Sequence, residues 1–133
     1  MTHYCCSGLI LYTKDGKVLL EDRGRINKHG EHWSFFGGSL KEGETKEQAL
    51  VREIKEELSF ELKDFTYIGR YDYKPKEDLV VTYYMYKTKV PSSQKLIPHA
   101  KASMKLFTYK QALKLRMLPI DKEIITDYYN SLV

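Results

Sequence analysis

The sequence predicts an α/β fold, namely an α/β/α sandwich in which helices cover both faces of a mixed central sheet. Short strand-like segments rich in Val, Leu, Tyr and Thr make up most of the chain, and turns containing Gly or Pro separate them. One amphipathic helix interrupts these segments, and two more helices follow the last strand. The 133 residues suffice for one hydrophobic core, so we expect residues 1–133 to form a single domain.

The first elements are predicted to be strands. Residues 4–13 and 17–22 form a hairpin whose turn contains Gly16. A polar loop follows, and residues 33–36 are predicted as a short strand. The double glycine Gly37-Gly38 is expected to end that strand, because glycine weakens strand structure.

Residues 46–58 are predicted as the first helix. Thr45 can serve as its N-cap, and Gln48, three residues later, completes a capping box. At about 100° per residue, four apolar side chains fall on one face of this helix. This core-facing stripe consists of Leu50, Val51, Ile54 and Leu58.

The remaining segments continue the α/β pattern. Residues 65–73 and 79–90 are predicted as a second hairpin, residues 91–102 as a loop, and residues 105–108 as a short strand. Two helices complete the chain, at residues 110–115 and 122–131, and Asp121 is expected to cap the second.

Composition excludes several classes of protein. No apolar run reaches the length of a transmembrane helix, and the N-terminus lacks the pattern of a secretion signal, so we expect a cytoplasmic protein with no membrane partner. The net charge of +4 is mild and dispersed, which suits a small polyanionic substrate and does not indicate nucleic-acid binding. The sequence leaves a homodimer open.

The predicted first helix carries a second, acidic face. Glu53, Glu56 and Glu57 share an arc next to the apolar stripe, with Arg52 at its edge. Like charges at these spacings repel by about 0.2–0.5 kcal/mol per pair on an exposed helix. A solvated acidic face is one explanation, and a bound divalent cation is the other. Clustered carboxylate oxygens favour Mg²⁺, with Mn²⁺ as the alternative, over zinc.

The segment Gly38–Phe60 resembles the Nudix box, which reads Gly, five residues, Glu, seven residues, Arg-Glu-apolar, any, Glu-Glu, any, Gly-apolar. Every defining position matches except Ser59, where the family has glycine. Upstream, Trp33-Ser34-Phe35-Phe36-Gly37-Gly38 resembles the family's Trp-x-x-Pro-Gly-Gly, with Phe36 in place of the proline. The resemblance implies the Nudix α/β/α fold.

The resemblance also implies roles for the residues of the box. Glu56 and Glu57 are expected to ligate the metal, Glu53 to be a third ligand or the general base, and the carbonyl of Gly38 to complete the metal sphere. Arg52 is expected to hold the catalytic loop and the glutamates by hydrogen bonds. Glu44 is expected to brace the loop or to contact the metal through water.

Outside the box the sequence offers fewer site residues. Arg23, at the end of the second strand, could grip a phosphate, although a surface role is equally compatible. Many Nudix enzymes carry another glutamate before the last core strand, but residues 96–103 contain no acid. His99 is the proton acceptor of that loop, with a plain surface histidine as the alternative, and the missing acid shifts the expected base to Glu53.

The sequence therefore predicts a divalent-metal-dependent Nudix hydrolase that cleaves a nucleoside diphosphate linked to another group X. A nucleoside triphosphate, a nucleotide sugar or an ADP-ribose type of compound would fit. One alternative is a catalytically silent Nudix module that binds a nucleotide or a protein partner, but such modules usually lose a box carboxylate. Another alternative is an RNA 5′-end pyrophosphohydrolase, which would favour a concentrated basic track.

Overall fold

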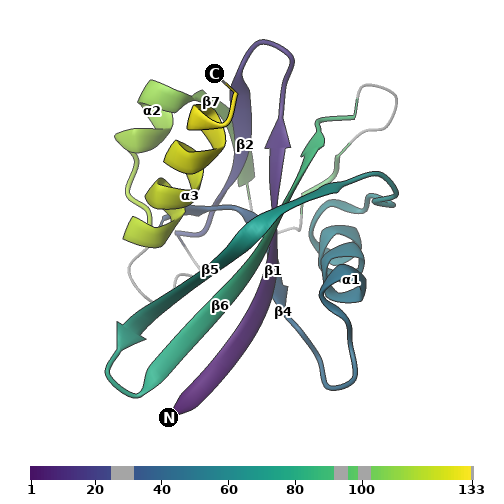
Figure 1. Ribbon diagram of the computed structural model, residues 1–133. Coiled ribbons are helices and arrows are strands. Elements are labelled where there is room, and N and C mark those ends of the chain that lie inside the picture. The colour runs from purple at the N-terminus through teal and green to yellow at the C-terminus, as the bar shows by residue number, and fades with distance from the viewer. Residues whose placement is uncertain (25–31, 92–95, 99–102, 133) are drawn as a thin grey trace.

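The computed structural model describes residues 1–24, 32–91, 96–98 and 103–132 (Figure 1). The strands are β1 (Thr2–Tyr12), β2 (Lys17–Asp22), β3 (Trp33–Ser34), β4 (Phe36–Ser39), β5 (Thr66–Lys76), β6 (Leu79–Lys89) and β7 (Ser103–Thr108). The helices are α1 (Lys46–Leu58), α2 (Tyr109–Leu113) and α3 (Pro119–Asn130). None of the helices among the described residues is long and apolar enough to cross a membrane.

Within the described residues, the strands form one seven-stranded sheet. The strand order is β3-β2-β1-β6-β5, while β4 also pairs with β1 and β7 also pairs with β2. The pairing of β1 with β6 is parallel and runs from Thr2 opposite Leu79 to Tyr12 opposite Lys89. The other pairings are antiparallel, so the sheet is mixed and the predicted α/β fold is confirmed.

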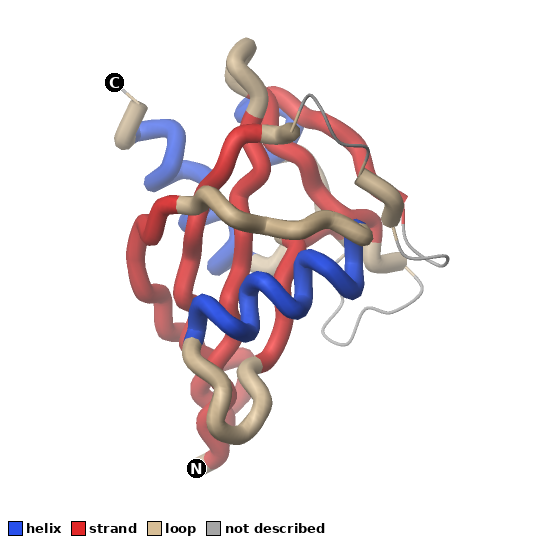
Figure 2. Tube along the Cα trace, turned by 90° about the vertical axis from the view of Figure 1, so that its right-hand side faces the viewer, coloured by secondary structure: helices blue, strands red, loops and turns tan. Residues whose placement is uncertain are grey.

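Helices cover both faces of the sheet. Helix α1 lies on one face, and α2 and α3 lie on the other (Figures 1 and 2). Strand β1 divides its side chains between the two resulting cores: Leu9 packs on the α1 side with Leu50 and Ile54, whereas Ile10 packs on the α3 side with Ile124. Successive side chains of a strand point to opposite faces, so one apolar strand stabilises both layers.

Helix α1 begins as predicted. The Thr45 side chain accepts a hydrogen bond from the backbone N–H of Gln48 at 3.1 Å, and the Gln48 side chain accepts one from the N–H of Thr45 at 2.9 Å. This capping box satisfies two backbone donors that the first helical turn leaves without partners. The helix ends at Ser59, whose φ of 53° and ψ of 38° are left-handed.

Several predicted element boundaries were wrong: β5, for example, runs to Lys76 and not to residue 73. Two of these errors have a clear physical cause. Gly37 and Gly38 do not end a strand but lie inside β4, paired with Gly8 and Ser7 of β1. A Cβ on Gly37 would lie 2.0 Å from the Ser7 carbonyl oxygen, so the absence of side chains lets β4 approach β1 closely.

The second error concerns the last helix. Helix α3 begins at Pro119, three residues before the predicted start, and Leu118 occupies its N-cap without a side-chain hydrogen bond. Proline suits this first position because it has no N–H to satisfy and its φ is already helical. Asp121 therefore lies in the first helical turn, where it is buried, and does not cap the helix.

Candidate active site

The sequence-predicted site residues lie where three elements meet. Helix α1 presents Arg52, Glu53, Glu56 and Glu57, strand β4 presents Gly37 and Gly38, and the turn before α1 presents Glu44. The packing of α1 against β4 and β1 fixes this arrangement. Buried Leu50, Ile54 and Leu58 hold the opposite side of the helix against the sheet.

Arg52 organises the acidic side chains. Its Nε and Nη2 atoms donate to the two carboxylate oxygens of Glu44 at 2.6 and 2.9 Å, a bidentate pair. Nη2 also donates to the Ser39 carbonyl oxygen at 3.0 Å, and Nη1 donates to Glu53 at 2.9 Å and to Glu56 at 3.4 Å. A single guanidinium thus ties the turn before α1 to the acidic face of the helix.

The charge on Glu44 is strongly favoured by these contacts. The hydrogen bonds from Arg52, together with one from the backbone N–H of Lys41 at 2.8 Å, lower the pKa of Glu44 to about 2. The same hydrogen bonds raise the pKa of Arg52 further above its ordinary value. Glu44 is therefore ionised at neutral pH and stabilises the turn, because its two carboxylate oxygens accept hydrogen bonds from Arg52 and from the N–H of Lys41.

The two glycines bring the β4 backbone next to the glutamates. The N–H of Gly37 donates to the Glu57 carboxylate at 2.7 Å. A Cβ on Gly38 would lie 2.5–2.7 Å from the carboxylate atoms of Glu53, so only glycine leaves room for that side chain where it stands. Backbone and carboxylates share one small volume at this point.

Glu57 differs from the other glutamates in its surroundings. Burial, followed by the negative charges of Glu21 and Glu53, raises the pKa of Glu57 to about 9, although the hydrogen bond from Gly37 and the charge of Arg23 act in the opposite direction. A carboxylate in this position needs a proton or a nearby cation to balance its charge.

Sequence reasoning missed Glu21, which belongs to this group. It lies on β2, its residue is 3% exposed, and burial raises its pKa. Arg23 Nε lies 3.8 Å from its carboxylate. Leu19, two residues before it, packs in the core on the α1 side. Residues two apart share a face of a strand, so an acid at that spacing was the available signal.

Two site residues were predicted outside the box, Arg23 and His99, and the structure describes Arg23. Arg23 follows β2 directly, pairs with Glu21, and its charge acts on Glu57. It is therefore part of the same neighbourhood as the carboxylates. His99 lies outside the described residues.

The donor set fits a hard divalent cation, because it consists of carboxylate oxygens beside a glycine backbone. In the side-chain positions of the structure, no three His, Cys, Asp or Glu groups of the described residues converge enough to hold a metal ion. In this arrangement Arg52 donates hydrogen bonds to the carboxylates of Glu53 and Glu56. A cation must therefore compete with this guanidinium for their oxygens.

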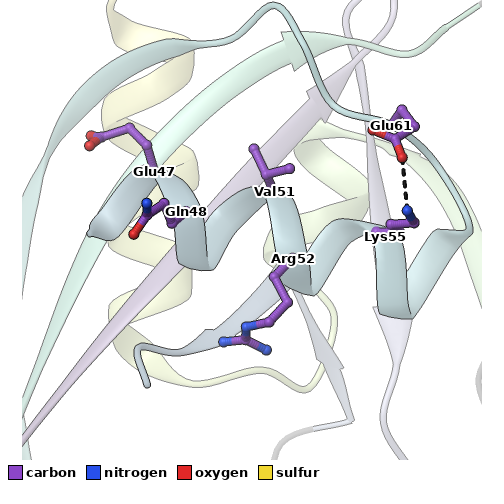
Figure 3. Close-up of a pocket in the computed structure, with 6 residues that line it drawn as sticks. All are labelled: Glu47, Gln48, Val51, Arg52, Lys55 and Glu61. Carbon is purple, nitrogen blue, oxygen red and sulfur yellow. Dashed lines mark ion pairs between the residues drawn. The ribbon is translucent and has the colours of Figure 1, made fainter. Parts of the chain in front are cut away.

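An open hollow of about 430 Å³ lies on another side of α1. Its lining is Glu47, Gln48, Val51, Arg52, Lys55 and Glu61 (Figure 3). Lys55 and Glu61 form an ion pair at 2.9 Å across one end, and Arg52 extends from the helix on the side away from Val51. Of the predicted site residues that the structure describes, only Arg52 lines this hollow, so Glu44, Glu53, Glu56 and Glu57 do not belong to it.

A model of the NUDIX domain matches residues 3–128 of the chain. The chain belongs to the NUDIX domain family. The resemblance seen in residues 38–60 is thereby confirmed, and Nudix hydrolases generally use divalent metal ions.

Individual Nudix relatives are similar over part of the chain. CTP pyrophosphohydrolase of Escherichia coli strain K12 is 39% identical over 56 residues, which cover 42% of this chain and 42% of that protein. RNA pyrophosphohydrolase of Hydrogenovibrio crunogenus is 36% identical over 63 residues, which cover 47% of this chain and 36% of that protein. The chain spans less than half the length of these two relatives.

The fold is similar over nearly the whole chain. The solution structure of the E. coli ORF135 protein matches with a TM-score of 0.77 and 25% identity, covering 98% of this chain and 91% of that one. The NUDIX-domain match over residues 3–128 and this structural similarity both extend well beyond the box, to the strands and to helices α2 and α3.

Proposed function

We propose that the protein is a divalent-metal-dependent pyrophosphohydrolase that cleaves a nucleoside diphosphate linked to another group X, with residues 1–133 as a single Nudix domain. The observation that carries this proposal is the complete set of box carboxylates, gathered by Arg52 and the β4 glycines. The similarity to proteins named as pyrophosphohydrolases supports it. Mg²⁺ is the proposed cation, with Mn²⁺ as a substitute.

The proposed roles follow from the contacts of each side chain. Glu56 and Glu57 would hold the cation together with the Gly38 carbonyl, and bound Mg²⁺ supplies a Lewis acid that polarises phosphate oxygens and a bound water. Glu53, which lies against Gly38, would take the proton of the attacking water. Arg23 would donate hydrogen bonds to a phosphate of the substrate.

The ionisation of Glu57 links metal binding to pH. Because the pKa of Glu57 is raised to about 9 in the metal-free protein, cation binding must displace a proton from this group. Activity should therefore increase from acidic to mildly alkaline pH, as the proton becomes easier to remove. Arg52 stays charged throughout this range and keeps Glu44 in place.

A product screen tests the proposal. The purified protein is incubated with nucleoside triphosphates, nucleotide sugars, ADP-ribose and dinucleoside polyphosphates, with Mg²⁺ or with excess EDTA. A triphosphate should yield a nucleoside monophosphate and pyrophosphate, which distinguishes this cleavage from release of the terminal phosphate. Turnover at full rate in excess EDTA would contradict the metal requirement.

Variants separate the proposed chemistry from folding. Glu53→Gln, Glu56→Gln and Glu57→Gln should each lower activity by at least about a hundredfold, the scale expected when a positioned metal or base is lost. The metal-free form of Glu57→Gln should be at least as stable as the parent, because the variant removes a half-buried carboxyl group whose charge is unfavourable there. Glu53→Gln and Glu56→Gln should stay folded, although each weakens one hydrogen bond with Arg52. Glu61→Gln, on an exposed side chain paired with Lys55, is the control and should keep full activity.

RNA 5′-end pyrophosphohydrolysis is the second candidate, favoured by the similarity to RNA pyrophosphohydrolase. A 5′-triphosphorylated oligonucleotide belongs in the same screen. Activity on it well above that on free triphosphates would favour this candidate. Tight binding of a nucleotide without any turnover in Mg²⁺ or Mn²⁺ would instead indicate a silent binding module.

A further inference from the structure

Glu21 is a buried acid that the roles assigned above do not use. It lies on β2, opposite Ser34 of β3 and Met104 of β7. Backbone pairing on both sides therefore fixes its position in the sheet. Its residue is only 3% exposed, and its side chain takes the α1 side of the sheet, as does that of Leu19.

The surroundings of Glu21 are rich in negative charge. Its carboxylate interacts electrostatically with Glu53 and with Glu57. Arg23 lies 3.8 Å away at Nε, which is beyond hydrogen-bond length. The charge of Arg23 acts on Glu21 and on Glu57. Arg52, the other arginine of the site, is already engaged by Glu44, Glu53 and Glu56.

A purely structural carboxylate would have a different environment. Buried carboxylates that serve a structural role are held by several donors, because an unsatisfied buried charge is destabilising. For Glu21, the contact that the structure shows is the ion pair with Arg23, with 3.8 Å between Nε and the carboxylate. A positive charge placed near Glu57 and Glu53 would balance Glu21 as well.

We propose that Glu21 adds its negative charge to the metal centre, so that β2 as well as α1 contributes to holding the divalent cation. This inference rests on the proposed metal-dependent function. It makes Glu21 a determinant of metal affinity, fixed in place by the pairing of β2 with β3 and β7. The acid would approach the cation from the sheet, while the box glutamates approach it from the helix.

Metal binding without substrate tests the inference directly. Titration with Mn²⁺, followed by electron paramagnetic resonance of the free ion, gives the dissociation constant of the parent, Glu21→Gln, Glu56→Gln and Glu61→Gln. We expect Glu21→Gln to bind Mn²⁺ at least tenfold more weakly than the parent, and Glu61→Gln to match the parent. Thermal unfolding in EDTA should show that Glu21→Gln is no less stable than the parent.

The outcomes distinguish this inference from the proposed function. Weak binding by Glu56→Gln with parent-like binding by Glu21→Gln would overturn the role of Glu21 and leave the proposed function intact. A parent protein that binds no Mn²⁺ would overturn both. If Glu21→Gln does not fold, Glu21→Asp replaces it: the shorter side chain keeps the charge but withdraws it, and it should also weaken Mn²⁺ binding. Unchanged affinity in Glu21→Asp would then contradict the inference.

Discussion

Replacing Ser59 with glycine should stabilise the protein. Ser59 ends α1 with φ of 53°, and it is the only non-glycine residue with positive φ in the described part of the chain. The left-handed conformation costs an L-residue about 1–2 kcal/mol. The greater freedom of glycine in the unfolded chain offsets about 0.4–1 kcal/mol of the gain. Ser59 is exposed, so its replacement removes no buried contact, and the net stabilisation should be about 1 kcal/mol.

Differential scanning calorimetry can detect this change. A chain of 133 residues has an unfolding entropy of about 0.3 kcal/mol/K near its midpoint, so Tm should rise by about 3–4 °C. Gly43→Ala is the matched control, because Gly43 has φ of +80° and a Cβ there would meet nothing within 4 Å. Its Tm should fall by a similar amount. A fall in Gly43→Ala with no rise in Ser59→Gly would refute the strain argument at the end of α1.

Three further predictions concern the site. Gly38→Ala should lower activity at least tenfold, because the new Cβ displaces the carboxylate of Glu53. Its Tm should stay within about 3 °C of the parent, since that carboxylate is flexible. Gly37→Ala should lower Tm far more, because its Cβ would meet backbone atoms. Arg52→Lys should lower both activity and Tm, since an ammonium group cannot replace the fork on Glu44; parent-like kinetics would contradict this. The raised pKa of Glu57 gives the metal-free protein stability that is complete below pH 4.5 and lost as the pH rises through about 9. In EDTA, Glu57→Gln should therefore exceed the parent in Tm at pH 8 and match it near pH 5, and equal values at both pH values would show that Glu57 is not buried as described.

Local signals in the sequence were reliable where one segment determines its own structure. The capping box of Thr45 and Gln48 and the apolar stripe of α1 depend on neighbours within two helical turns. The capping box was predicted correctly, and of the stripe Leu50, Ile54 and Leu58 are buried whereas Val51 is only partly buried. The role of Gly37 could not be read in this way. Its close approach to Ser7 depends on a partner strand thirty residues away in the sequence, and glycine alone indicates a break as readily as a close contact.

The candidate site was predictable to the same extent. The box glutamates have helical spacings, so the sequence alone places them on one side of α1. Glu21 comes from a different element, and it reaches Glu53 and Glu57 only because the sheet positions β2 beside α1. The spacing from Leu19 indicates that Glu21 faces the α1 side, but it does not identify the residues of α1 that Glu21 meets. The prediction that Asp121 caps the last helix was wrong because α3 begins at Pro119, earlier than the cap pattern indicated.

The parallel pairing of β1 with β6 bears on how the chain folds during synthesis. Thr2 lies opposite Leu79 and Tyr12 opposite Lys89. The parallel partner of β1 is therefore synthesised almost eighty residues after β1 itself. Loop closure over such a distance is slow, and sheets that depend on it fold slowly. During synthesis, the apolar residues of β1 therefore lack their parallel partner until Lys89 has left the ribosome, and an unpaired apolar strand can form non-native contacts in that interval.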